Sequence, residues 1–177
     1  MTRSILLHCA LLAAAVIPAS AQQQANAPAA KAVATQRQLW MDVTRSIQRA
    51  AEQMPEADYA FRPVESVRTF GQLIGHIAGA QNHMCGTALG ESLGGEDDVE
   101  KSATSKAALV EALKASTAIC ERAYAQSDAQ AAGAVTMYGR DRTRLYAIGM
   151  NTLHNGEHYG NIVTYMRMKG MVPPSSQ

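Results

Sequence analysis

The sequence has few aromatic residues, few cysteines and only one long hydrophobic run. Phe, Trp and Tyr make up 5% of its 177 residues. Alternating stretches of β-branched and aromatic residues, which are typical of strands, are hard to find, so we do not expect a large sheet. Alanine is frequent, and 47% of the residues are hydrophobic, which favours helices around an ordinary core. The length fits a single domain.

The chain also lacks an excess of charge of either sign. It carries 16 Lys and Arg against 15 Asp and Glu, and the basic count falls to 15 if the segment containing Arg3 is removed. No basic stripe is available for nucleic acid, so we expect no nucleic-acid partner. The sequence also contains no nucleophile triad, phosphate-binding loop or dinucleotide motif. A small-molecule substrate is compatible with these absences, and a homodimer stays one of the possible assemblies.

The long hydrophobic run, Ile5 to Ile17, lies near the N-terminus. Its 13 residues are too few to cross a membrane as a helix, which needs about 20 residues. Pro18 ends the run, and small residues up to Ala21 resemble a signal-peptidase cleavage site. We therefore predict a signal peptide over residues 1–21 and a periplasmic or secreted protein with no membrane span after cleavage. A buried N-terminal helix is the alternative.

The cysteines bear on the same prediction. Cys9 lies inside the hydrophobic run, where a lipid-attachment cysteine would not normally lie, so we prefer simple cleavage. Cys85 and Cys120 stay in the mature chain, which would meet an oxidising compartment. An even number of cysteines in an exported chain favours a disulfide between them, although two separate buried thiols are the alternative.

Hydrophobic periodicity predicts four amphipathic helices after a flexible tether at residues 22–34. We place candidate N-caps at Ser66 for the second helix, at Ser105 or Thr104 for the third, and at Asp141 for the fourth. Four such helices form an all-α four-helix bundle over residues 35–177. The expected helices cover residues 35–54, 66–89, 106–126 and 141–169.

The connector between the second and third helices has about fifteen residues, from 90 to 104. Fully extended, it could reach roughly 50 Å, whereas the second helix is about 35 Å long. The connector can therefore cross the bundle, so that the second and third helices run parallel. That arrangement places Cys85 near the level of Cys120.

Three histidines form the strongest functional pattern. His154 and His158 are four residues apart, so they lie one turn apart on the same helix face, within the predicted buried stripe. Buried polar rings need partners, and one metal ion would satisfy both. His76 lies near the middle of the second helix and can meet the pair if the two helices are antiparallel neighbours. His83 is about 10 Å further along, so we expect it at the rim of the site.

Each histidine also has a simpler interpretation. His76 alone could be a hydrogen-bonded core residue, and the pair alone could be two partly exposed polar residues. A helical pair with a third histidine at matching depth favours a site for one divalent ion. Imidazole ligands suit zinc, nickel, iron or copper, and the sequence does not choose among them.

Two segments carry a resemblance to a known family. They are SVRTFGQLIGHIAGAQ around His76 and NTLHNGEHYGNIVTYMRMKGMVPPSS around His154 and His158. Over residues 35–174 the chain resembles the DinB superfamily of small helical metalloproteins. The resemblance implies an up-down-down-up four-helix bundle with one metal-binding histidine on the second helix and a pair on the last.

The resemblance implies two kinds of reaction. Some members are thiol-dependent S-transferases or isomerases, and others are metal-dependent hydrolases. Because low-molecular-weight thiols are cytosolic, export favours the hydrolase, while an S-transferase and a non-catalytic metal-binding or stress-related module stay as alternatives. The H-x-x-E-H spelling at residues 154–158 also matches an inverted zinc-protease motif. We reject that fold because no acidic residue follows His158, and we expect Glu157 to be a solvated helix residue.

Overall fold

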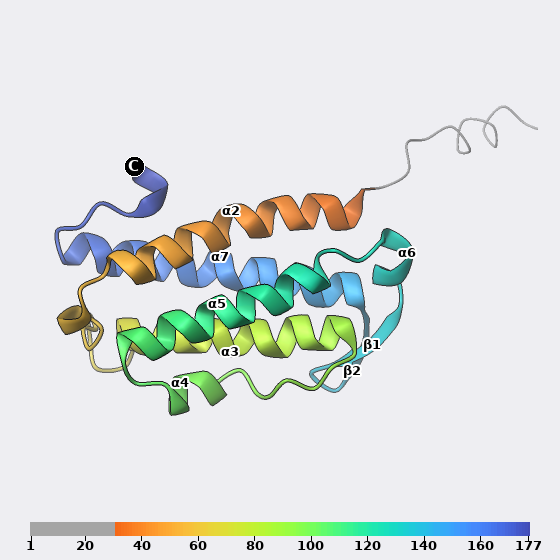
Figure 1. The fold of residues 1–177 in the computed structure, drawn as a ribbon, viewed down its shortest axis with the longest axis horizontal. Helices are drawn as coiled ribbons and strands as arrows, with labels where there is room; N and C mark the ends of the chain where they lie inside the picture. Colours follow the sequence, from red (N-terminus) through yellow and green to blue (C-terminus); the bar gives the residue numbers. More distant parts are fainter. Residues whose placement is uncertain (1–30) are drawn as a thin grey trace, which may run out of the picture. The chain divides into compact units, whose positions relative to one another are not determined.

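The computed structural model describes residues 31–177, and its main feature is a bundle of four long helices (Figure 1). The predicted signal peptide and most of the predicted tether lie outside these residues. Across the described range, no helix is both long and apolar enough to span a membrane. The long helices are α2 (Ala32–Gln53), α3 (Phe70–Leu89), α5 (Lys106–Ala123) and α7 (Arg144–Met168). The short elements are η1 (Glu56–Asp58), α4 (Asp98–Ser102), α6 (Asp128–Ala131), β1 (Ala134–Met137), β2 (Arg140–Thr143) and η2 (Pro174–Ser176).

The helices follow an up-down-down-up order. Leu109, near the start of α5, lies against Gly71 and Gly75 near the start of α3, so these two helices run in the same direction. A disulfide joins Cys85 to Cys120 further along the same two helices, with their Cα atoms 5.1 Å apart. The four-helix bundle predicted from the sequence is therefore confirmed.

Contacts of α7 with α3 and with α2 give the directions of the remaining helices. The Tyr165 hydroxyl, near the end of α7, donates to the carbonyl oxygen of Arg68 just before α3, which makes those two helices antiparallel. Asn155 of α7 donates to the Thr44 hydroxyl of α2, and Gln53 at the end of α2 bonds to Gln177 beyond the end of α7. Helices α2 and α7 therefore run parallel to each other.

The first helices begin at other residues than expected. Helix α3 is capped by Thr69 rather than Ser66: the Thr69 side chain accepts from the Gln72 amide, and the Gln72 side chain accepts from the Thr69 amide. This reciprocal capping box satisfies two backbone donors at once. Ser66 cannot form one, because the residue three positions after it is Thr69 rather than Glu or Gln. Helix α2 begins at Ala32, inside the predicted tether, because the Asp128 carboxylate accepts hydrogen bonds from the first backbone amides of the helix.

The last helices differ as well. Residues 134–143 form an antiparallel hairpin that periodicity did not predict, with Val135 opposite Arg142. Its two-residue turn, Tyr138 and Gly139, has positive φ at both positions, as hairpin turns of type I′ require. Asp141 therefore lies in β2, and Thr143 caps α7 instead. Helix α5 ends at Ala123, short of the predicted residue 126.

Two hydrophobic clusters fill the interior of the bundle. One surrounds Phe70 and Met166 near the start of α3 and the end of α7. The other surrounds Trp40, whose ring stacks on Tyr124 at a centroid distance of 4.5 Å, and it contains the disulfide. Along α7, the predicted metal-binding pair lies between Ile148 of the second cluster and Ile162 of the first.

Candidate metal centre

The three predicted histidines come together between α3 and α7. The Nε2 atom of His76 lies 3.1 Å from the Nε2 atom of His154, and that of His158 lies 3.0 Å from the same atom. His76 and His158 are buried, whereas His154 is partly exposed. Because α3 and α7 are antiparallel, histidines from the middle of each helix meet at one level. The group could hold a metal ion.

The arrangement fits an ion better than it fits hydrogen bonds alone. A ring nitrogen has either one proton or one lone pair, so the Nε2 atom of His154 can make only one good hydrogen bond to its two neighbours. Three lone pairs can converge on one cation. Nitrogens that bind a common zinc ion at about 2.0–2.1 Å are about 3.3 Å apart in tetrahedral geometry, close to the spacing observed.

Burial keeps two of these rings uncharged. It is the main cause that lowers the pKa of His154 to about 3, with the charges of His158 and His76 adding to the effect. Burial likewise lowers the pKa of His158 to about 4. At neutral pH both imidazoles are therefore neutral, which is the form that binds metals.

The outer nitrogen of His76 has a carboxylate partner that sequence reasoning missed. His76 Nδ1 lies 2.9 Å from Asp97 Oδ1 and 3.9 Å from Glu100 Oε2. The hydrogen bond with His76 is the main reason that the pKa of Asp97 is lowered. Arg68 lies beside both acids, with its Nε donating to Glu100 at 2.9 Å and a terminal nitrogen 3.3 Å from Asp97.

Two glycines on α3, which have no side chain, allow the segment with these acids to pack close to the site. A Cβ atom at Gly75 would lie 2.7 Å from the Glu100 Cα atom, and one at Gly79 would lie 2.1 Å from the Glu96 carbonyl oxygen. The connector that contains α4 therefore runs directly along the backbone of α3 (Figure 1). Glycines four residues apart in the middle of a helix were the sequence signal for this contact.

A cleft of about 540 Å³ opens beside His158. Apolar side chains of Val67 and Leu73 form part of its wall, and Arg68 and Glu100 supply charged groups. A small molecule in this cleft would lie next to the histidine group.

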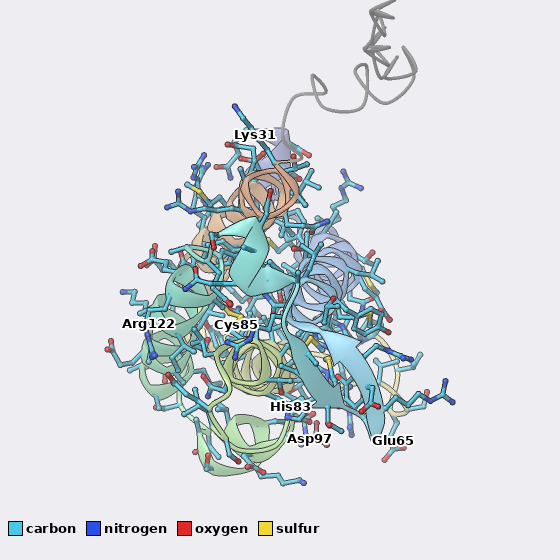
Figure 2. All side chains as sticks on the ribbon, turned by 90° about the vertical axis from the view of Figure 1, so that its right-hand side faces the viewer. Lys31, Glu65, His83, Cys85, Asp97 and Arg122 are labelled. Carbon is cyan, nitrogen blue, oxygen red and sulfur yellow. A yellow bond between two sulfur atoms is a disulfide. The ribbon has the colours of Figure 1, made fainter. Side chains whose placement is uncertain are left out.

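The other candidate residues lie outside the histidine group. His83 is partly buried, and its ring centroid is 5.5 Å from that of Tyr138 at the hairpin turn. Glu157 is exposed on the outer face of α7. Figure 2 shows Cys85 inside the bundle and Asp97 at its edge. The disulfide therefore lies in the interior, where both cysteines are fully buried.

Comparison with known proteins concerns the family and the fold. A sequence profile of the DinB superfamily matches residues 39–162. Among curated protein sequences, none matches significantly. The fold is similar to that of a DinB-like protein from Bacillus cereus, with 20% identity, coverage of 78% of this chain and 93% of the other, and a TM-score of 0.66.

Two further solved structures share the fold. A DinB-like protein from Bacillus subtilis has 16% identity, with 84% of this chain and 99% of the other covered and a TM-score of 0.58. A mycothiol-dependent maleylpyruvate isomerase has 17% identity, with 76% and 65% covered and a TM-score of 0.59. Since the family profile spans most of residues 31–177 and the fold agrees, this chain belongs to the DinB superfamily.

Proposed function

We propose that this chain is an exported metal-dependent hydrolase that binds one divalent transition-metal ion through His76, His154 and His158. The observation that carries the proposal is the convergence of three Nε2 atoms beside an open cleft. Zinc, nickel and iron all accept three imidazole ligands. The signal-like N-terminus and the disulfide support export.

The residues around the site suit small substrates. Three protein ligands leave a coordination position open, and an ion held in this way would lower the pKa of a bound water and polarise a carbonyl or phosphoryl group. The cleft beside His158 offers an apolar wall at Leu73 and a charged edge at Arg68, which together would orient a substrate with an apolar body and a polar end.

A thiol-dependent S-transferase is the second candidate. It is favoured by the fold shared with the mycothiol-dependent isomerase, whose name indicates a thiol cosubstrate. Export would separate this chain from cytosolic thiols, so we rank hydrolysis first. A non-catalytic metal-binding module is the third candidate, and it would bind the ion without turning over any substrate.

The test begins with the metal content of protein purified from its export compartment. We expect about one transition-metal ion per chain, bound by the wild type and by His83→Ala. The loaded protein is then screened with ester, amide and phosphoester substrates, and separately for thiol transfer. Hydrolysis that requires the metal supports the proposal. Thiol transfer alone, or metal binding with no activity in either screen, would replace it with the second or third candidate.

A further inference from the structure

Asp97 contacts the candidate site from a part of the chain that contributes none of the three histidines. It lies in the connector between α3 and α5, and its Oδ1 atom is 2.9 Å from His76 Nδ1. We infer that Asp97 is a positioning residue, which holds His76 in the tautomer and orientation that present its Nε2 lone pair to the ion. This inference rests on the proposed metal binding at the same site.

The hydrogen bond decides which ring nitrogen has the proton. An ionised carboxylate only accepts hydrogen bonds, so the contact requires a proton on His76 Nδ1. In the neutral ring the Nε2 atom then has the lone pair, and it is the atom that faces His154. A carboxylate on the outer nitrogen also makes the imidazole a better electron donor to a metal, which strengthens the metal–ligand bond.

Asp97 is held in place by groups on both sides of the site. A terminal nitrogen of Arg68 lies 3.3 Å from Asp97, and Arg68 Nε donates to Glu100 at 2.9 Å. The backbone of Arg68 is in turn fixed to α7, because its carbonyl oxygen accepts a hydrogen bond of 2.8 Å from the Tyr165 hydroxyl. A chain of contacts therefore runs from the helix with two of the histidines to the acid that orients the third.

The loop around Asp97 is also ordered by local contacts. The side chain of the neighbouring Asp98 accepts from the Gly95 amide at 2.7 Å. The close approach of Glu96 to Gly79 holds the same segment against α3. Asp97 and Asp98 are thus adjacent carboxylates with separate tasks, which makes Asp98 a matched control.

Among the three histidines, His76 alone has a carboxylate on its outer nitrogen within the described chain. His154 Nδ1 is buried without a hydrogen-bond partner there, and His158 Nδ1 lies 3.3 Å from the side-chain amide of Asn161. His76, Asp97 and Glu100 also lie close enough together to hold an ion. The Arg68 guanidinium contacts both acids and supplies positive charge there, which disfavours a second cation. The geometry therefore assigns Asp97 an orienting task.

The experiment compares zinc affinity in four forms of the full-length protein: wild type, Asp97→Ala, Asp97→Asn and Asp98→Asn. Affinity is measured by competition with a chromophoric chelator. We expect Asp97→Ala to bind zinc about 10–100-fold more weakly than the wild type. Asp97→Asn keeps an acceptor oxygen and loses the charge, so its affinity should fall between these two. Asp98→Asn keeps an acceptor oxygen for the Gly95 amide, so the loop is retained and its affinity should match the wild type. Equal zinc affinity in wild type and Asp97→Ala would overturn the inference.

A second measurement separates this inference from the proposed function. Nitrogen-15 NMR of the metal-free wild type should show His76 protonated at Nδ1, and Asp97→Ala should shift the ring toward the Nε2–H tautomer. Failure of the wild type to bind zinc, nickel or iron would refute the proposed function, whereas a His76 ring protonated at Nε2 in the wild type would refute the role of Asp97. If Asp97→Ala does not fold, the Asn variant decides both measurements.

Discussion

Two groups of buried polar side chains lie within one turn of each other on the inner face of α7, and they are built differently. Asn151 donates to the Tyr124 hydroxyl at 3.1 Å, and that hydroxyl donates to the Ile148 carbonyl oxygen at 2.6 Å. In this group each contact joins a donor to an acceptor. In the histidine group, like atoms meet, because three Nε2 atoms face one another.

The difference indicates which buried polar group stabilises the fold and which one has another purpose. Donors paired with acceptors recover the hydrogen bonds that they lose on leaving water. Three nitrogens that converge on His154 Nε2 can recover only one good hydrogen bond among them, so the fold keeps them at a cost that a bound ion would offset. Changes in the histidine group should therefore alter metal binding, and changes in the group around Tyr124 should alter stability alone.

The largest effect is expected for His154→Ala. This substitution removes the nitrogen that contacts both other rings, so stoichiometric metal should be lost. Zinc should raise the melting temperature of the wild type, because an ion that binds the native state adds stability, and it should leave that of the variant unchanged. Metal analysis and thermal unfolding with and without zinc measure both. His83→Ala is the control, and equal metal loss in both variants would show that the ligand on α3 is misassigned.

The disulfide, like the hydrogen-bonded group around Tyr124, should affect stability and leave metal binding unchanged. It closes a loop of 35 residues between α3 and α5. Replacing Cys85 and Cys120 together by serine should lower the free energy of unfolding by about 2–4 kcal/mol, through the greater entropy of the unfolded chain. Urea unfolding of the metal-free proteins measures this change. Non-reducing peptide mapping of the exported wild type should find the bridge, and two alkylated cysteines would contradict it.

Residue spacing alone predicts much of the buried core and the meeting of the three histidines. Periodicity of three and four places Trp40, Ile47 and Met84 in the interior, where they lie, and equal depth along two helices predicts which histidines meet. Spacing along one helix cannot show which distant loop lies against it. Asp97 and Arg68 were therefore missed, since their positions depend on how the connector packs against Gly75 and Gly79.

Helix ends and the hairpin were missed for a different reason. The sequence offers several residues that can cap a helix, and tertiary contacts choose among them. Thr69 is selected by its partner Gln72, and Asp141 is excluded as a cap because it pairs with Thr136 in the hairpin. The hairpin has only four residues in each strand, too few for a clear alternation of polar and apolar side chains.

Gly79→Ala tests whether the packing of the connector against α3 affects both the stability of the fold and the affinity for zinc. The added methyl group would overlap the Glu96 carbonyl oxygen, so the connector must move away from α3. We expect a loss of about 1–3 kcal/mol in the free energy of unfolding, as is typical of overpacking. Zinc affinity should fall as well, because Asp97 moves with the loop.

Gly149→Ala is the matched control for that substitution. A Cβ atom at Gly149, in the second turn of α7, would meet nothing within 4 Å. Because alanine is the better helix former, this variant should gain about 0.5–1 kcal/mol in the free energy of unfolding and keep its zinc affinity. If both alanine variants bound zinc as the wild type does, the position of the connector would have no bearing on the site.

The smallest loss of stability is expected for Tyr124→Phe, which acts within the hydrogen-bonded group. The ring keeps its stacking on Trp40, but the Asn151 amide loses its hydroxyl acceptor, whereas the Ile148 carbonyl oxygen still accepts from the Thr152 hydroxyl. Removing the hydroxyl acceptor of a buried amide should cost about 1–2 kcal/mol in the free energy of unfolding. Zinc affinity should not change, because the hydroxyl has no contact with the histidine rings. Urea unfolding and chelator competition on the same preparation measure the two quantities together. A fall in zinc affinity without a loss of stability would reverse the assignment and would show that the two groups act as one site.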